Sequence, residues 1–241
     1  MKLRGINVDD ILHWLTDNRN EANVAGMAHF AISGSEVMGI RLPALRAKAR
    51  TCGHDTDAAR LLWQSGIHEA RIMASMIADP HDFTLADMEC WCADFDSWDV
   101  CDQCCLNLFW QLPFAKDAIE VCAADEREFV RRCAFALMAV MAVHAEPDDN
   151  IDFAHWLHII REYSTDRRNF VKKAVNWALR QIGKRSMALN TLAVDTARQL
   201  AESDNSTARW IGKNALNELT STRTVEFIKS HRESRFGTPA E

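Results

Sequence analysis

Glycine and proline are sparse in this sequence, with 9 and 5 among its 241 residues, and there is a single tyrosine. Alternating runs of β-branched residues are absent, which argues against a β-sheet protein. No apolar run approaches the roughly 18 residues that a membrane-spanning helix needs. Nothing at the N-terminus resembles a signal peptide, so we expect a cytoplasmic protein with no membrane partner.

Motifs for cofactor or metal chemistry are missing as well. The histidines show no metal-ligand spacing, and there is no glycine-rich phosphate loop or nucleophile elbow. Cys101 and Cys104, with cysteines nearby, could be proposed as a zinc site, but no second Cys-x-x-Cys pair follows. Cysteines within apolar helical patterns are more typical of small buried side chains. We therefore expect a reduced protein with no metal and no organic cofactor.

What the sequence does contain is a helical pattern that repeats. Apolar residues recur at spacings of three and four, and similar segments open near residues 68, 97, 128, 169 and 205. Intervals of about 30 to 40 residues are typical of HEAT-type helix pairs, each of which buries its apolar face against the next pair. The sequence thus predicts an all-α, HEAT-like helical-repeat solenoid with a concave groove, the face on which a partner of such a solenoid usually lies. We expect a single domain over residues 1–235 and a disordered tail at 236–241.

The charge is distributed unevenly along the chain, which carries −6 overall. Residues 1–160 hold 13 Lys and Arg against 25 Asp and Glu, whereas residues 161–241 hold 15 against 9. The last third is therefore a basic surface on an acidic body. A local basic face is enough for phosphate contacts, while the acidic remainder lowers non-specific affinity for nucleic acid.

Within the basic third, the segment 167–185 predicts an amphipathic helix with a tryptophan among its cations. At 100° per residue, one face within roughly 60° holds Lys173, Trp177, Arg180 and Lys184. The opposite face holds Val171, Ala174, Val175, Ala178 and Ile182. An aromatic ring in a basic stripe suits a polyanion with stackable rings, that is, nucleic acid. The alternative is a tryptophan packed under a neighbouring helix with lysine stems around it.

A second helix is predicted to begin near Ser97, with Ser97 or Asp96 as its N-cap. Trp98 and Asp102 are four residues apart, so an indole and a carboxylate share one helix face. The ring face attracts a cationic ligand, and the carboxylate can stabilise positive charge on a sugar as a glycosidic bond breaks. Alternatively, Asp102 caps a helix or pairs with an arginine, and Trp98 is half-buried packing.

Arg132 is the third residue of interest, because its helix is apolar around most of its circumference. Arginine is rarely placed in such a helix without a partner. One interpretation is a structural ion pair with Asp99 or Asp102. The other is a contact with phosphate or substrate in the groove.

Five segments, taken in order, resemble the AlkD-like family of DNA alkylation-repair glycosylases, which are built from HEAT-like repeats. The resemblance runs from about Asn20 to Ser221, and its segments are residues 25–30, 38–46, 97–102, 130–134 and 170–180. It implies a monofunctional glycosylase that excises cationic alkylpurines, such as 3-methyladenine and 7-methylguanine, from double-stranded DNA. It also implies that the groove holds the duplex by its backbone, without a deep base pocket.

The resemblance implies roles for individual residues as well. Asp102 matches the catalytic carboxylate, Trp98 and Trp177 match tryptophans that contact the lesion nucleotide, and Arg132 matches an arginine of the groove. Many members carry a tyrosine where this chain has Phe30, so we expect Phe30 to contact DNA while the hydroxyl contact in the groove is lost. On this hypothesis the phosphate contacts come from the basic helix, through Lys172, Lys173, Arg180, Lys184 and Arg185.

A function of another class stays open, namely a non-catalytic HEAT-repeat module that binds DNA or a protein partner. The enzyme requires Asp102 to face the same cleft as Trp177, whereas a scaffold does not. For the enzyme, we expect a monomer whose partner is alkylated duplex DNA.

Overall fold

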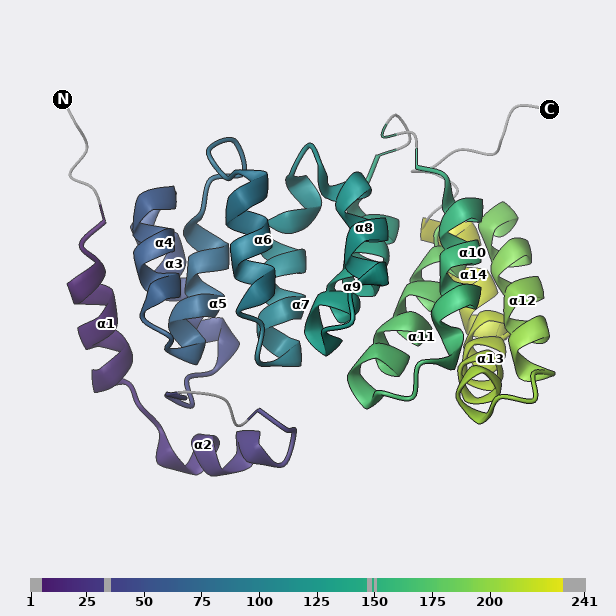
Figure 1. Cartoon of the computed structure of the whole chain (residues 1–241), viewed down its shortest axis with the longest axis horizontal. Coiled ribbons are helices and arrows are strands. Elements are labelled where there is room, and N and C mark those ends of the chain that lie inside the picture. Colours follow the sequence, from purple (N-terminus) through teal and green to yellow (C-terminus); the bar gives the residue numbers. More distant parts are fainter. Residues whose placement is uncertain (1–5, 33–35, 147–148, 150, 232–241) are drawn as a thin grey trace. The chain divides into compact units, whose positions relative to one another are not determined.

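The computed structural model describes residues 6–32, 36–146, 149 and 151–231 (Figure 1). The chain falls into two compact units. The first, residues 1–114, contains α1 (Val8–Asp17), α2 (Glu21–Ala28), α3 (Leu42–Cys52), α4 (Thr56–Gln64), α5 (His68–Ile77), α6 (Leu85–Ala93), α7 (Trp98–Asn107) and the 3₁₀ helix η1 (Phe109–Gln111).

The second unit, residues 115–241, is also helical. It contains α8 (Ala115–Ala124), α9 (Glu128–His144), α10 (Phe153–Glu162), the 3₁₀ helix η3 (Tyr163–Thr165), α11 (Asn169–Gly183), α12 (Met187–Ala201), α13 (Ser206–Leu219) and α14 (Thr222–His231). No strand occurs among the described residues of either unit.

The repeat starts predicted from the sequence are confirmed. Alternate helices begin at His68 (α5), Trp98 (α7), Glu128 (α9), Asn169 (α11) and Ser206 (α13). Consecutive members of this series lie side by side within each unit, α5 against α7 and α9 against α11 and then α13. The all-α, HEAT-like repeat class is therefore confirmed. The concave groove stays a prediction.

An aromatic cluster forms much of the core of the first unit. Trp63 on α4 stacks on Trp91 of α6, with ring centroids 4.1 Å apart and planes at 3°. Phe83 packs edge-on against Trp91 at 4.8 Å, and Phe109 of η1 closes the cluster at 6.4 Å from Trp91. Offset and edge-on aromatic pairs contribute about 0.5–1.5 kcal/mol each beyond the burial of their area.

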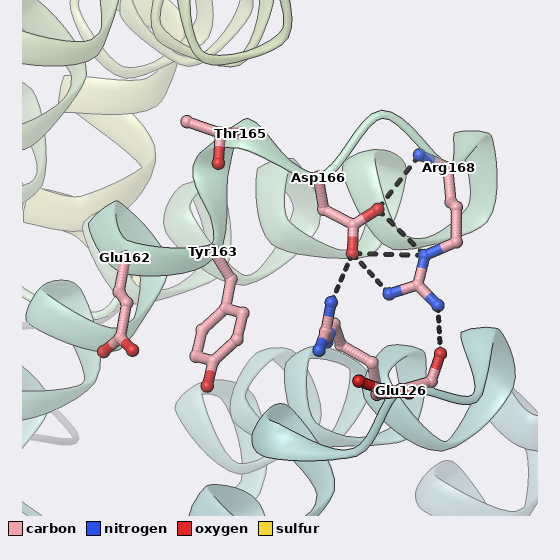
Figure 2. A pocket seen from close by; sticks show the side chains of 7 residues that line it. Glu126, Glu162, Tyr163, Thr165, Asp166 and Arg168 are labelled. Carbon is pink, nitrogen blue, oxygen red and sulfur yellow. Dashed lines mark hydrogen bonds and ion pairs between the residues drawn. The ribbon is translucent and has the colours of Figure 1, made fainter.

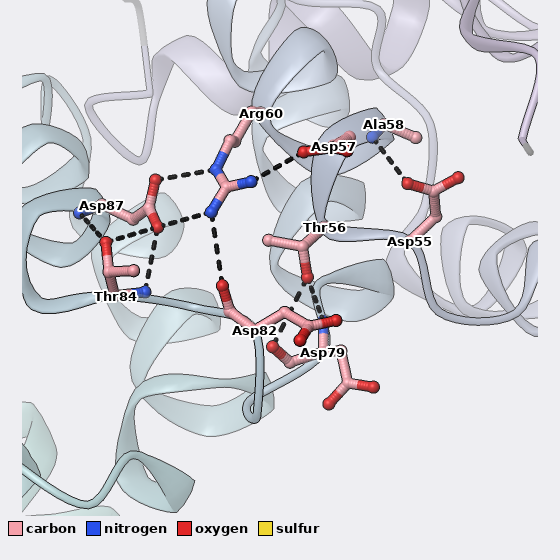
Figure 3. A network of polar contacts seen from close by, with 9 residues as sticks. All are labelled: Asp55, Thr56, Asp57, Ala58, Arg60, Asp79, Asp82, Thr84 and Asp87. Atoms are coloured by element: carbon pink, nitrogen blue, oxygen red, sulfur yellow. Dashed lines mark hydrogen bonds and ion pairs between the residues drawn. The ribbon is translucent and has the colours of Figure 1, made fainter.

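A polar network joins the same two helices near the N-terminus of α6 (Figure 3). Arg60 of α4 donates from two nitrogens to the carboxylate of Asp87, both at 2.8 Å. Asp87 is also the third residue of a capping box with Thr84. The bonds from Arg60, partly opposed by burial, hold the pKa of Asp87 well below its usual range. The network therefore fixes α4 against α6 with a charge-assisted, two-pronged contact.

In the second unit, α9 is buried along much of its length, and α13 approaches α12 closely at one glycine. In α9 every residue from Arg132 to Ala142 is buried. Gly212 of α13 packs directly on α12, since a Cβ at this position would lie 2.3 Å from the backbone nitrogen of Ala201. Only glycine fits there without displacing backbone.

The structure does not test the predicted domain bounds or the predicted tail. A single domain over residues 1–235 stays a prediction, and the tail at 236–241 lies outside the described residues. Over the part of the chain that the structure describes, none of the helices has both the length and the hydropathy of a membrane span.

Candidate nucleic-acid interface

Trp98 and Asp102 lie one turn apart on α7, in the first unit. Ser97 is the N-cap residue, buried and extended (φ −146°), but its hydroxyl donates to the Asp99 carboxylate instead of accepting from a helix N–H. Trp98 is half-buried and Asp102 is 9% exposed. The shared helix face predicted for the indole and the carboxylate follows from this geometry.

The indole of Trp98 is held by the segment that follows α2. Its Nε1–H donates to the carbonyl oxygen of Phe30 at 2.9 Å. Phe30 is 68% exposed, more than any other large apolar residue among the described residues of the first unit. The Phe30 backbone therefore lies beside the Trp98 indole, and a DNA contact by the Phe30 side chain stays a prediction.

Sequence reasoning missed Glu69, the second residue of α5, which is 1% exposed. Its carboxylate accepts hydrogen bonds from the backbone N–H groups of Met38, Gly39 and Ile40 at 2.8, 2.6 and 3.2 Å. Gly39 has φ +72°, and a Cβ there would lie 2.4 Å from the carbonyl oxygen of Asn20. Glu69 thus anchors the segment between α2 and α3. An acid within an apolar helix pattern is the only signal that the sequence offers for it.

His68 and Asp99 tie α5 to the first turn of α7. His68 Nε2 lies 2.9 Å from the Asp99 carboxylate, and His68 is 3% exposed. Burial lowers the pKa of His68, but the hydrogen bond and charge of Asp99 outweigh it and leave that pKa raised. Burial likewise raises the pKa of Asp99, and the bonds from His68 and Ser97 bring it below its usual value. The contact therefore favours a protonated His68 and an ionised Asp99, and Asp99 is the residue next to Trp98 in the chain.

Arg132 lies on α9 in the second unit and is 6% exposed. Its guanidinium Nη1 donates to the carbonyl oxygen of Phe170, in the first turn of α11, at 2.6 Å. A buried arginine that bonds to a backbone carbonyl keeps its positive charge fixed in position. Arg132 is thus oriented by the neighbouring repeat.

The amphipathic face predicted for α11 is confirmed. The residues expected to be apolar and inward, Val171, Ala174, Val175, Ala178 and Ile182, are all fully buried. On the opposite face Lys173 is exposed and Trp177 is half-buried. Trp177 is therefore outside the core formed by α11, as the helical geometry predicts.

The two cations at the end of this face are paired with α13. Arg180 and Lys184 both contact the carboxylate of Glu218, the lysine at 2.7 Å. Burial raises the pKa of Glu218, but the bonds from Lys184 and Arg180 outweigh it and hold the pKa below its usual value. Their side chains retain 31% and 22% exposure, so they remain near the surface. Contacts of these residues with phosphate stay a prediction.

The prediction for Arg185 requires a correction. Arg185 is 4% exposed, and its guanidinium donates to the carbonyl oxygens of Ala142 and Ala145 at 3.0 and 2.7 Å. It thus satisfies the carbonyl end of α9 and lies 5.0 Å from the Phe153 ring centroid. A side chain buried in this way is not a phosphate contact at the surface.

An aromatic ring that the sequence left without a role lies beside the first turn of α11. The Lys172 ammonium is 4.7 Å from the ring centroid of Trp210 on α13, and Trp210 is 41% exposed. Its position among the repeat starts was visible in the sequence, but its neighbour was not, because Lys172 lies in another repeat.

A polar pocket of about 390 Å³ lies at the junction of η3 and α11 (Figure 2). Asp166 accepts from Arg131 at 2.8 Å and from Arg168, and Arg131 lies 5.0 Å from the Tyr163 ring centroid. Burial raises the pKa of Asp166, but these bonds lower it to about 2. The sequence does carry a sign of this arrangement, which the sequence analysis missed. An Asp-x-Arg segment comes directly before α9, at 125–127, and directly before α11, at 166–168.

The cysteines near α7 are buried, as expected of small core side chains. Cys101, Cys104 and Cys105 are all fully buried. Burial raises the pKa of the Cys104 thiol well above its usual value, so the thiol stays protonated.

The four residues of the predicted active site thus belong to two units, Trp98 and Asp102 to the first, Arg132 and Trp177 to the second. Each pair is placed on the repeat helices that the sequence predicted for it. That all four line one groove stays a prediction.

Comparison with known proteins gives a family and a fold. A family model described as DNA alkylation repair enzyme matches residues 11–219. No curated protein matches the chain. One solved structure, described as a new family of proteins related to the HEAT-like repeat DNA glycosylases with affinity for branched DNA structures, has a TM-score of 0.74, with 15% identity over 88% of this chain and 95% of that chain. A designed armadillo repeat protein in complex with the peptide (KR)4 has a TM-score of 0.37, with 14% identity over 78% of this chain and 85% of that chain.

Proposed function

Because the chain belongs to the family of DNA alkylation repair enzymes, we propose that it is a glycosylase which hydrolyses the N-glycosidic bond of cationic alkylated purines in duplex DNA. The observation that carries the proposal is the pair on α7, where Asp102 lies one turn from Trp98 and the indole is fixed by the Phe30 carbonyl. A carboxylate and an oriented ring on one face are what a cationic nucleotide requires.

In this mechanism the lesion supplies part of the driving force. Alkylation at N3 or N7 gives the purine a positive charge, so the base leaves as a neutral molecule with the electron pair of the broken C–N bond. Positive charge then develops on the sugar, where the Asp102 carboxylate stabilises it and orients the attacking water. Water adds to the anomeric carbon and loses a proton, which leaves an abasic site.

The remaining residues bind and position the DNA. Trp98 and Trp177 would form aromatic walls around the lesion nucleotide, and Arg132, held by the Phe170 carbonyl, would position the lesion strand. The exposed Phe30 and the surface cations would contact the backbone. These cations are Lys172, Lys173, Arg180 and Lys184.

The test of the active site is Asp102→Asn, which removes the charge and keeps the shape. We expect release of methylated base to fall by at least about a hundredfold, as for loss of one electrostatic contact to a transition state, with duplex affinity nearly unchanged. The matched control is Asp117→Asn on the exposed first turn of α8, which should leave both quantities unchanged. Full base release by Asp102→Asn would rule out this assignment of the carboxylate.

A second candidate is a DNA-binding repeat protein without glycosylase activity. It is favoured by the low exposure of Asp102, at 9%, which suits a structural carboxylate as well as a catalytic one. In that case the wild-type protein binds duplex DNA but releases no methylpurine, and Asp102→Asn lowers stability instead of activity.

A further inference from the structure

Trp210 on α13 lies outside the buried stripe of that helix. The buried stripe of this helix consists of small and aliphatic side chains, Thr207, Ala208, Ile211, Gly212, Ala215 and Leu219. Trp210 lies beside this stripe and is 41% exposed. A large aromatic side chain that stays partly exposed in this position presents ring surface to a ligand.

The neighbours of this ring are set by a regular register between α11 and α13. Asn176 donates to Asn214 at 2.8 Å, and Arg180 pairs with Glu218, so residues 38 apart face each other along the two helices. Lys172 and Trp210 are the first pair in this ladder, with the ammonium 4.7 Å from the ring centroid. The cation–π contact holds the indole in place at the surface.

The surroundings of Trp210 are basic. Lys173 is exposed on the same turn of α11 as Lys172, and Lys213 is exposed one turn after Trp210. This surface also lies over the first halves of α11 and α13, whose N-terminal ends carry partial positive charge. An aromatic ring with several cations around it fits a chain of phosphates that carries stackable bases.

We propose that Trp210, together with Lys172 and Lys213, forms a stacking site for an unpaired nucleotide of the bound DNA, one repeat beyond Trp177. The occupant is an unpaired nucleotide because an indole stacks on the face of a base, and a paired base inside a duplex exposes only its edges. The proposal rests on the proposed function in one respect, that the basic face of α11 binds DNA.

The test compares two DNAs, a fully paired duplex and the same duplex with a short single-stranded tail. We expect Trp210→Ala to weaken binding of the tailed DNA by about five- to tenfold, the lower part of the range for base–aromatic stacking, and binding of the paired duplex by less than about twofold. Trp210→Phe keeps a stacking ring and should restore most of the affinity. Leu192→Ala, a change at a residue 45% exposed on α12, is the matched control and should change neither affinity.

A direct measurement accompanies these variants. A tail that carries a halogenated uracil should crosslink on irradiation to the peptide that contains Trp210, as identified by mass spectrometry. Equal loss of affinity for both DNAs in Trp210→Ala, or no loss for either, would overturn the proposal, as would a crosslink confined to other helices.

The outcomes separate this site from the proposed function. If the wild-type protein binds the tailed DNA through Trp210 but releases no methylpurine, the glycosylase assignment fails and the stacking site stands. If it releases methylpurine while Trp210→Ala binds both DNAs as the wild type does, the stacking site alone fails. If it binds neither DNA, both are overturned.

Discussion

The same substitution is predicted to have different effects at two adjacent cations, Lys184 and Arg185: it should lower folding stability at Arg185 and the salt dependence of DNA binding at Lys184. Arg185 is buried and donates to two carbonyl oxygens at the end of α9, whereas Lys184 is partly exposed and pairs with Glu218. Methionine at either position keeps much of the side-chain volume and removes the charge. The pair of variants therefore separates a structural cation from a surface cation on one helix end.

The expected magnitudes follow from these contacts. Hydrogen bonds from a charged group contribute about 1.5–3 kcal/mol each, so loss of both in Arg185→Met should lower the free energy of unfolding by about 3–6 kcal/mol. Lys184→Met removes one partly exposed ion pair and should cost less than about 1 kcal/mol. If Lys184 contacts a phosphate, its loss should reduce the log–log salt dependence of duplex binding by about 0.9.

The assay is urea unfolding of both variants, together with duplex affinity measured over a range of salt concentrations in conditions where both are folded. Arg185→Met should leave the salt slope unchanged, because the side chain does not reach the surface. An unaltered free energy of unfolding in Arg185→Met, with a reduced salt slope, would refute this reasoning and restore Arg185 as a phosphate contact.

The remaining predictions concern packing and pH. Gly212→Ala places a Cβ against the backbone of α12 and should lower the melting temperature markedly, whereas Gly26→Ala, with open space around its Cβ, should leave it unchanged or raise it; equal effects would contradict the packing argument. Because the pKa of His68 is raised in the folded state, the stability that protonated His68 contributes is fully present below about pH 6.5. It is lost as the pH rises through the pKa that His68 has in the folded protein. Because the pKa of Asp99 is lowered in the folded state, the stability that ionised Asp99 contributes is present above about pH 4 and is lost as the pH falls further. The stability difference between the wild type and His68→Gln should therefore be largest at about pH 5–6 and shrink toward pH 8 in urea titrations; a difference independent of pH would exclude the ion pair.

Helix positions and helix faces could be predicted from the sequence because they depend on local spacing. The starts near residues 68, 97, 128, 169 and 205, and the buried face of α11, follow from a period of about 3.6 residues. On the helix predicted over residues 167–185, Arg185 lies about 100° further round than Lys184 and so falls toward the buried side. In the structure α11 ends at Gly183, and Arg185 follows it as a buried side chain.

Partners from other repeats could not be predicted in this way. Glu218 pairs with Arg180 and Lys184, Trp210 lies beside Lys172, and Glu69 binds a backbone segment some 30 residues earlier. Such contacts depend on the register between neighbouring helices, which a single sequence does not specify. The sequence therefore predicts which helix faces carry the candidate site residues. It does not predict the charged and polar groups from other repeats that lie beside them.

The measurement that tests the central claim most directly is release of free purines by the purified wild-type protein from methylated DNA and from undamaged DNA. The account predicts that methylated purines are released from the first alone, with one abasic site formed for each base released and with no added metal or cofactor. Binding of methylated duplex without release of any base would contradict it and identify the protein as a repeat module that binds DNA without glycosylase chemistry.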